Sequence, residues 1–156
     1  GGCAPGMYAM LSAIVDYVCW IGKQFKDTED RRELYVEGMT RIMLHERALL
    51  YRLLHGSDEV KGLLDIEGVK VAVDMDDLTE RDLIVPIVFD KLTCEEASRA
   101  YEKKGVVVHE RTDASLYSAR QVNSINLHGI VRISPLHCHT YADIDEFLKI
   151  TAEIAK

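Results

Sequence analysis

One arginine interrupts an apolar run near the C-terminal end of the chain. Arg132 stands in the sequence G-I-V-R-I-S-P, residues 129–135, which is otherwise apolar or small and rich in β-branched residues. Such a composition is typical of a β-strand. A guanidinium presents a planar fork that binds a carboxylate through two parallel, charge-assisted hydrogen bonds. An arginine held on a rigid strand is therefore a candidate for binding the carboxylate of a small molecule.

Arg132 also has a purely structural interpretation. On the solvent-facing side of an edge strand, an arginine extends its charged end into water or pairs with a nearby acid. Strand alternation puts Ile130 on the same side as Arg132, and Val131 and Ile133 on the other side. This pattern alone leaves both interpretations open.

Two weaker candidates precede this strand. His109 and Arg111 belong to the stretch H-E-R-T-D-A-S-L-Y, residues 109–117. A role for either side chain near a substrate or a cofactor is implied only by the family resemblance described at the end of this section. Each is also consistent with an ordinary residue of a polar loop.

The run His137-Cys138-His139 contains residue types that bind metals. Neighbouring residues in an extended loop point in different directions, however, and zinc needs about four converging ligands. The sequence offers no second cluster to supply them, so we expect no metal site.

The four cysteines are widely spaced and include no C-x-x-C pair. This usage fits the reducing cytoplasm better than a disulfide framework. Cys94 stands where a helix is predicted to begin, and a helix dipole lowers the pKa of a thiol there. A half-buried structural thiol is nevertheless the favoured interpretation. The start G-G-C-A-P-G lacks the basic region of a secretory signal.

The charge and hydropathy of the chain argue against two classes of partner. Its formal net charge is −7, which is unfavourable for a general nucleic-acid binder or a binder of anionic membranes. Residues 7–22 are apolar, but Ser12 and Asp16 interrupt them and the run is short for a bilayer span. A buried helix is the structure expected for this run.

Helical periodicity dominates the first third of the chain. Pro5 stands where a first helical turn begins, and apolar residues from Ala9 to Ile21 follow at helical spacing. A second helix is predicted from about residue 30 to residue 55, with one apolar and one charged face. Gly56 suits the left-handed position after its end.

After the second helix the spacing of the apolar residues changes from a helical to a strand-like period. The predicted strands are residues 69–73, 83–89, 106–109 and 130–134. Pro86 inside the second strand argues for an edge strand or a bulge. Thr93 and Glu96 form a T-x-x-E capping box, which opens a helix that ends at Gly105. Residues 111–128 are polar, and we expect them to be irregular.

The C-terminal helix is clearly marked at its start. Pro135 ends the strand that carries Arg132, and Thr140 is the predicted N-cap, with Asp143 in the capping-box position. Residues at helical spacing predict one buried face. They are Ile144, Phe147, Leu148, Thr151, Ala152 and Ala155.

Together these elements predict an α+β fold. Two long N-terminal helices lead into a small, largely antiparallel sheet of three to four strands that is covered by helices. We divide the chain into a helical segment at residues 1–56 and an α+β domain at residues 57–156.

The sequence V-R-I-S-P, followed by a short loop with His and Thr and then an acidic amphipathic helix, resembles the C-terminal end of the class V aminotransferase and cysteine desulfurase family. Members are pyridoxal-phosphate (PLP) enzymes of fold type I, whose small domain is similar to the predicted α+β domain. The resemblance implies that Arg132 binds the α-carboxylate of an amino-acid substrate. The stretch K-K-G-V-V-V-H-E-R, residues 103–111, matches only loosely.

The resemblance also implies what this chain does not contain. A PLP enzyme needs a Schiff-base lysine, an acid and a group stacked on the ring, and in this family all three belong to the large domain. We therefore expect a C-terminal fragment without catalytic residues, inactive alone, joined by residues 1–56 to a large domain that binds most of the PLP. The full-length protein is expected to be a homodimer. Gly1-Gly2 lack the threonine of a family loop that grips the partner's cofactor phosphate.

One departure from the family pattern reduces the number of reactions that we expect. In cysteine desulfurases the loop after the G-V-V-V-like strand carries a nucleophilic cysteine, whereas no cysteine occurs here between Cys94 and Cys138. The expected enzyme therefore belongs to the aminotransferase, epimerase (isopenicillin N epimerase-like) or lyase branch. The alternatives are a cysteine desulfurase or selenocysteine lyase, and a non-catalytic α+β dimerisation or binding module.

Overall fold

The structure is a computed structural model that describes residue 2 and residues 4–156. Gly1 and Cys3 lie outside the described residues. The chain divides into two compact units, Gly1–His45 and Glu46–Lys156. This boundary falls inside the second helix, so the last turns of that helix belong to the second unit. Within the described residues, no helix has both the length and the hydropathy that a membrane span requires.

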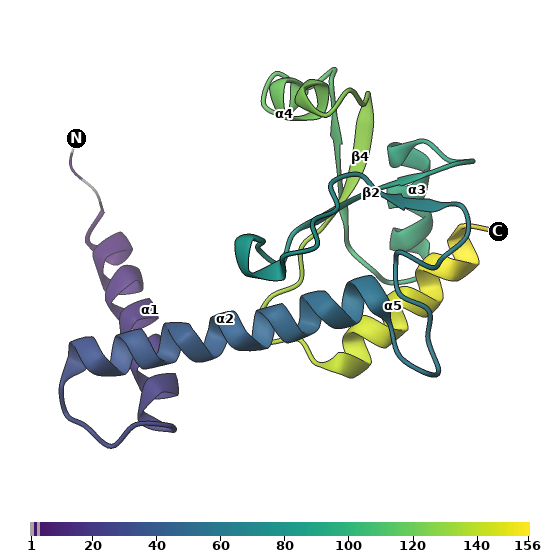
Figure 1. The fold of residues 1–156 in the computed structure, drawn as a ribbon. Coiled ribbons are helices and arrows are strands. Elements are labelled where there is room, and N and C mark those ends of the chain that lie inside the picture. Colours follow the sequence, from purple (N-terminus) through teal and green to yellow (C-terminus); the bar gives the residue numbers. More distant parts are fainter. Residues whose placement is uncertain (1, 3) are drawn as a thin grey trace. The chain divides into compact units, whose positions relative to one another are not determined.

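The first unit is a helical hairpin. It contains α1 (Pro5–Lys23) and the first part of α2 (Arg31–His55) (Figure 1). The two backbones approach closely at two glycines. A Cβ on Gly22 would lie 2.0 Å from a backbone oxygen of α2, and a Cβ on Gly38 would lie 2.0 Å from the backbone oxygen of Val18. Any side chain at either position would push the helices apart.

The expected burial of the first helix is wrong for most of its surface. Only Val18, Cys19 and Gly22 of α1 are buried. Met10 and Ile14 remain about half exposed, because the close contacts with α2 lie in the last turns of α1, around Val18 and Gly22. The apolar period predicts the helix correctly but does not show which side chains are covered.

The second unit is built on a four-stranded antiparallel sheet. Its strands are β1 (Val69–Val71), β2 (Val85–Phe89), β3 (His109–Thr112) and β4 (Gly129–Ile133). They lie in the order β1-β2-β4-β3; Figure 1 labels the central strands β2 and β4. β4 is thus a central strand, paired with β2 on one side and with β3 on the other. The predicted α+β fold with a small antiparallel sheet is confirmed.

Helices cover one face of this sheet. α3 (Cys94–Lys103) packs against β2, β3 and β4, and α5 (Tyr141–Ile154) packs against α3. The rings of Tyr101 and Phe147 stack with their centroids 5.3 Å apart. The last turns of α2 complete the core with Leu49, Leu50, Leu53 and Leu54.

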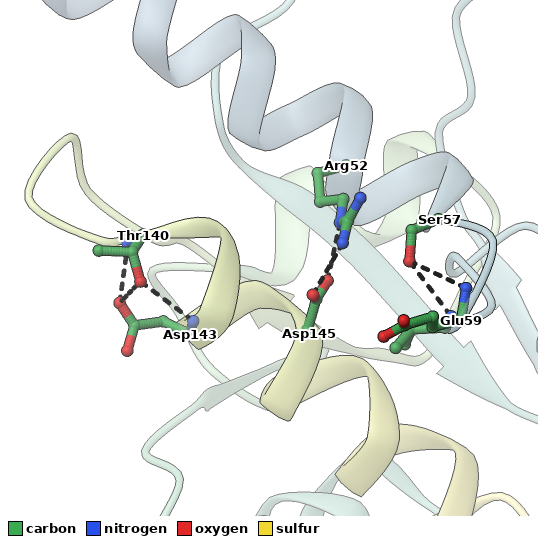
Figure 2. Close-up of polar contacts among 7 residues, drawn as sticks. Arg52, Ser57, Glu59, Thr140, Asp143 and Asp145 are labelled. Atoms are coloured by element: carbon green, nitrogen blue, oxygen red, sulfur yellow. Dashed lines mark hydrogen bonds and ion pairs between the residues drawn. The ribbon is translucent and has the colours of Figure 1, made fainter.

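Both predicted capping boxes are present. Thr93 and Glu96 form the box at the start of α3. Thr140 and Asp143 form the box of α5, which Figure 2 shows. In each box the threonine hydroxyl accepts from the backbone N–H of the acid, and the carboxylate accepts from the backbone N–H of the threonine. Donors that a helix start leaves unpaired are thereby satisfied.

A bidentate ion pair joins α2 to α5. Arg52 Nε and Nη2 donate to the two carboxylate oxygens of Asp145 at 2.7 and 2.8 Å (Figure 2). The side-chain hydrogen bond from Arg52 holds the pKa of Asp145 below its usual range. Both side chains are mostly buried, so solvent screens this pair less than an exposed one.

The predicted strand at residues 106–109 is wrong in position, since β3 begins at His109. Gly105, at φ 79°, turns the chain out of α3, and the Val106 N–H donates to the Tyr101 carbonyl. Val106 and Val108 pack against the core from this connection. Their apolar character therefore reflects burial of a connection and not of a strand.

Residues 111–128 contain a short helix where irregular structure is expected. α4 spans Ala119–Ser124, and Val122 is its only buried residue. A six-residue helix with one buried side chain leaves no apolar period to detect. The other predicted strands differ from the observed ones by one or two residues at their ends. The acidic turn contains a 3-10 helix, η1 (Leu78–Glu80).

Pro86 lies on a central strand, so the predicted edge strand is wrong. The Pro86 carbonyl accepts from the Ala72 N–H at 2.8 Å, just beyond the end of β1. The N–H and C=O of one strand residue point to the same side. The missing N–H of the proline therefore faces Ala72, just beyond the end of β1, so the proline removes only the last bond between these two strands.

Candidate functional site

Arg132 lies in the middle of the sheet. Its partners in the register are Pro86 on β2 and His109 on β3. Val131 and Ile133, its neighbours in β4, belong to the core under the helices. Alternation directs Arg132 to the opposite face of the sheet. The arginine is therefore not on an edge strand.

The Arg132 side chain carries an unpaired buried donor. Its Nε is buried and has no hydrogen-bond partner among the described residues. A buried donor left without a partner costs about 1–3 kcal/mol. A ligand that brings a hydrogen-bond acceptor to this position removes that cost.

Two cavities are lined by Arg132. The first has a volume of about 490 Å³ and lies between residues 105–109, residues 132–136 and the first turns of α5. The second has a volume of about 370 Å³ and is lined by parts of β3 and β4, by α4 and by the segment that leads from β1 to β2. Because Arg132 points away from the core, its side chain faces the second cavity.

The register brings the three predicted site residues to one face. His109 is directly opposite Arg132, and Arg111 is opposite Ile130, two positions along β4. Directly opposite residues share a face, as do residues two apart. Only Arg111 lines the second cavity with Arg132, whereas the exposed His109 lines the first. Arg111 Nη1 donates to the carbonyl of Glu110 at 2.8 Å.

Sequence reasoning misses a further cation in the second cavity. Arg81 follows η1, in the segment interpreted as an acidic turn, and its side chain is only 6% exposed. Its Nη1 and Nη2 are both buried without a hydrogen-bond partner among the described residues. Burial lowers the pKa of this guanidinium. The sequence feature that could have drawn attention to Arg81 is that it is the only Lys or Arg between Lys70 and Lys91.

The described cysteines, Cys19, Cys94 and Cys138, are all free. Burial raises the pKa of the Cys94 thiol to about 11, and its Sγ donates to Glu95 at 3.2 Å. The dipole effect considered for this helix start is therefore outweighed. Cys138 is exposed and lines neither cavity of Arg132.

The described part of the chain holds no group of three or more side chains that could bind a metal ion. In the run 137–139 the two imidazoles have different surroundings. His139 Nδ1 accepts from the backbone N–H of Leu136 at 3.0 Å, whereas His137 lies 3.8 Å from the Glu46 carboxylate. The two imidazoles thus do not converge on one point.

The residues of the two cavities do not provide a covalent anchor for PLP. A Schiff base requires a lysine, and no described lysine lines either cavity of Arg132. The cavities do provide arginines with free donors. This donor set fits an anionic group of a substrate better than it fits the aldehyde of the cofactor.

No protein-family model and no curated sequence matches the chain. Among solved structures it is similar to the apo structure of a cysteine desulfurase from Thermococcus onnurineus NA1, with a TM-score of 0.64 and 18% sequence identity. The likeness shows a shared fold. It covers 80% of this chain and 28% of that chain, so this chain spans less than a third of the neighbour's length. At this identity the likeness does not show a shared activity.

Proposed function

We propose that this chain is the C-terminal part of a PLP-dependent enzyme that acts on an amino acid, and that Arg132 binds the α-carboxylate of the substrate. The observation that carries the proposal is the Arg132 side chain, which points from a central strand into a cavity with its Nε buried and unpaired. The fold shared with a cysteine desulfurase supports the enzyme class. Away from bulk water, a guanidinium attracts a carboxylate more strongly than it does on an exposed surface.

On this proposal PLP is bound by a part of the protein outside this chain, because neither cavity contains a lysine. The cofactor, when bound, withdraws electrons from the α-carbon of the amino acid. Arg132 would hold the carboxylate and thereby fix the orientation of the α-carbon of the amino acid. The chain alone has no activity, and the whole protein is a cytoplasmic homodimer. The three free cysteines support a reducing compartment.

We favour the aminotransferase, epimerase or lyase branch over a desulfurase. Residues 113–128, which follow β3, contain no cysteine. The Cys94 thiol, with its pKa raised to about 11, stays protonated near neutral pH, whereas sulfur transfer requires a thiolate. The fold neighbour is a cysteine desulfurase, which supports a desulfurase as the alternative.

An absorbance titration of the complete protein with a panel of amino acids tests the proposal. We expect a PLP absorbance band that changes saturably with amino acids of one type. Arg132→Ala should raise the dissociation constant roughly tenfold or more, the worth of a charge-assisted hydrogen bond, and leave the band in place. Arg99→Ala, at an exposed position of α3, is the matched control and should change nothing.

Two results would contradict the proposal. A complete protein without a PLP band supports the non-catalytic binding or dimerisation module. An Arg132→Ala variant that binds amino acids as well as the parent shows that Arg132 has no role in substrate binding.

A further inference from the structure

Three arginines line the second cavity. Arg81 comes from the segment after η1, Arg111 from β3 and Arg132 from β4. One carboxylate is fully bound by the fork of one guanidinium. Arg111 already donates to a backbone carbonyl. If Arg132 binds the α-carboxylate, no group of the substrate has yet been assigned to Arg81.

The side chain of Arg81 is deeply buried. It is 94% buried, since 6% is exposed, and neither terminal nitrogen has a hydrogen-bond partner among the described residues. A buried cation whose terminal donors make no hydrogen bond is unfavourable for folding. The burial of this guanidinium is explained if an anion from outside the chain binds to it.

Asp74 is the ion-pair partner of Arg81, but no described carboxylate around the cavity hydrogen-bonds to its terminal nitrogens. Asp74 Oδ1 lies 3.8 Å from Arg81 Nη1, which is too far for a hydrogen bond, and its side chain is 50% exposed. Glu80 and Asp82 also line the cavity, and both are exposed to solvent. The carboxylates of Asp74, Glu80 and Asp82 are therefore accessible to solvent, whereas the buried charge of Arg81 is positive.

The rest of the wall includes apolar side chains. Pro86, Ile125 and Ile130 line the cavity together with the arginines. Such a lining suits a short aliphatic chain that carries acidic groups.

We propose that the second cavity accepts a substrate with two acidic groups, and that Arg81 is the residue that recognises the second one. This proposal rests on the proposed function. Arg132 binds the α-carboxylate, and Arg81 binds a carboxylate or phosphate of the amino acid's side chain. The substrate class is then an amino acid with an acidic side chain.

The binding can be tested on the 156-residue chain without PLP. The probes are succinate, which carries two carboxylates on a short aliphatic chain, and inorganic phosphate. The readout is the NMR signals of the arginine Nε–H groups during titration. We expect saturable shifts of the Arg81 and Arg132 signals with succinate, their loss in Arg81→Gln, and their retention in Arg99→Gln.

Each outcome decides the proposal. Tighter binding of phosphate than of succinate, again lost in Arg81→Gln, supports the site and assigns a phosphate as the second group. No saturable shift with either probe, or shifts that Arg81→Gln leaves unchanged, overturns it. Because PLP is absent, such a failure is separate from a failure of the amino-acid titration on the complete protein.

A second measurement distinguishes recognition from a structural role. Arg81→Met removes the buried charge and keeps the apolar part of the side chain. If Arg81 serves a ligand, the melting temperature of the ligand-free chain should stay equal or rise. A clear fall, with Arg99→Met unchanged, shows that Arg81 stabilises the fold and overturns the proposal.

Discussion

Arg81 and Arg132 have buried donors without partners, whereas the buried hydroxyl of Tyr101 is fully paired. Tyr101 is completely buried, and its hydroxyl lies 2.7 Å from the Thr151 hydroxyl. Thr151 in turn donates to the Phe147 carbonyl at 2.8 Å. The fold thus satisfies the hydroxyl of Tyr101, whereas we assign the donors of Arg81 and Arg132 to a ligand. Arg47 Nε and Ser98 Oγ are also buried without a partner among the described residues, so a missing partner alone does not mark a ligand site.

Thr151→Val should destabilise the chain by about 1–3 kcal/mol, because it leaves the buried Tyr101 hydroxyl without an acceptor. Tyr101→Phe should cost less, about 0.5–1.5 kcal/mol, since Thr151 keeps its bond to the Phe147 carbonyl. Urea denaturation of both variants measures the difference. A larger loss in Tyr101→Phe would contradict this assignment of donor and acceptor.

Two cysteines should differ in their response to pH. Burial, the largest cause, raises the Cys94 pKa to about 11, while Cys138 is exposed. Iodoacetamide reacts with the thiolate, so at pH 7.5 it should label Cys138 first. Labelling of Cys94 should increase only as pH rises towards 11. Peptide mass spectrometry reads each site, and fast labelling of Cys94 at neutral pH would contradict the burial argument.

At the same scale, sequence reasoning recognises Arg132 but misses Arg81. An arginine inside an apolar strand breaks a pattern and is therefore visible. Arg81 stands among acids in a turn-like segment, where a cation looks like a neutralised surface charge. Its burial depends on how the chain between β1 and β2 lies over the sheet, and no local pattern encodes that.

At the scale of elements, the ion pair between α2 and α5 makes a pH-dependent contribution to stability. Arg52 holds the Asp145 pKa below its usual value. Stability from a depressed carboxyl pKa is present above the unfolded value of about 3.9 and is lost as pH falls through the lower folded value.

Arg52→Met should therefore lower the melting temperature at pH 7, because it leaves Asp145 without its partner. The difference from the parent should begin to shrink below about pH 4 and disappear as pH falls through the depressed pKa of Asp145 in the folded parent. Arg99→Met provides the control for loss of an exposed arginine. A difference that stays constant from pH 7 to pH 3 would show that packing, and not charge, accounts for the effect.

The hairpin of α1 and α2 depends on glycine at its crossing. In Gly38→Ala the new Cβ meets the Val18 carbonyl at 2.0 Å, so this unit should lose stability while the sheet does not. Hydrogen exchange should show less protected amides in α1 and unchanged protection in β2 and β4. Gly6→Ala, which meets nothing within 4 Å, should leave the exchange pattern unchanged, and an equal effect of both variants would refute the close approach.

Which elements could be predicted depends on how locally they are encoded. The two capping boxes and the long helices follow from short-range spacing, and they are confirmed. β3 and α4 do not follow from it. The apolar residues Val106 and Val108 pack against the core from the loop between α3 and β3. The helix α4 has one buried side chain. Pro86 on a central strand also depends on where β1 ends, which is a property of the whole sheet.

At the scale of the whole molecule, the helices cover one face of the sheet and Arg132 points from the other. The α+β class is predictable because the change from helical to strand periodicity runs through the whole chain. The assembly of the second cavity is not, since it requires the register of three strands and the path of the segment between β1 and β2. The chain spans 28% of its fold neighbour, so the cofactor chemistry is a proposal about the complete protein.

The central claim is that Arg132 binds the carboxylate of an amino acid, and a double-mutant cycle tests it most directly. The complete protein and its Arg132→Ala variant are titrated with the preferred amino acid and with the amide of its α-carboxyl group, while the PLP absorbance is followed. The parent should bind the acid roughly tenfold or more tightly than the amide, and Arg132→Ala should bind the two alike. An undiminished preference for the acid in Arg132→Ala would contradict the account.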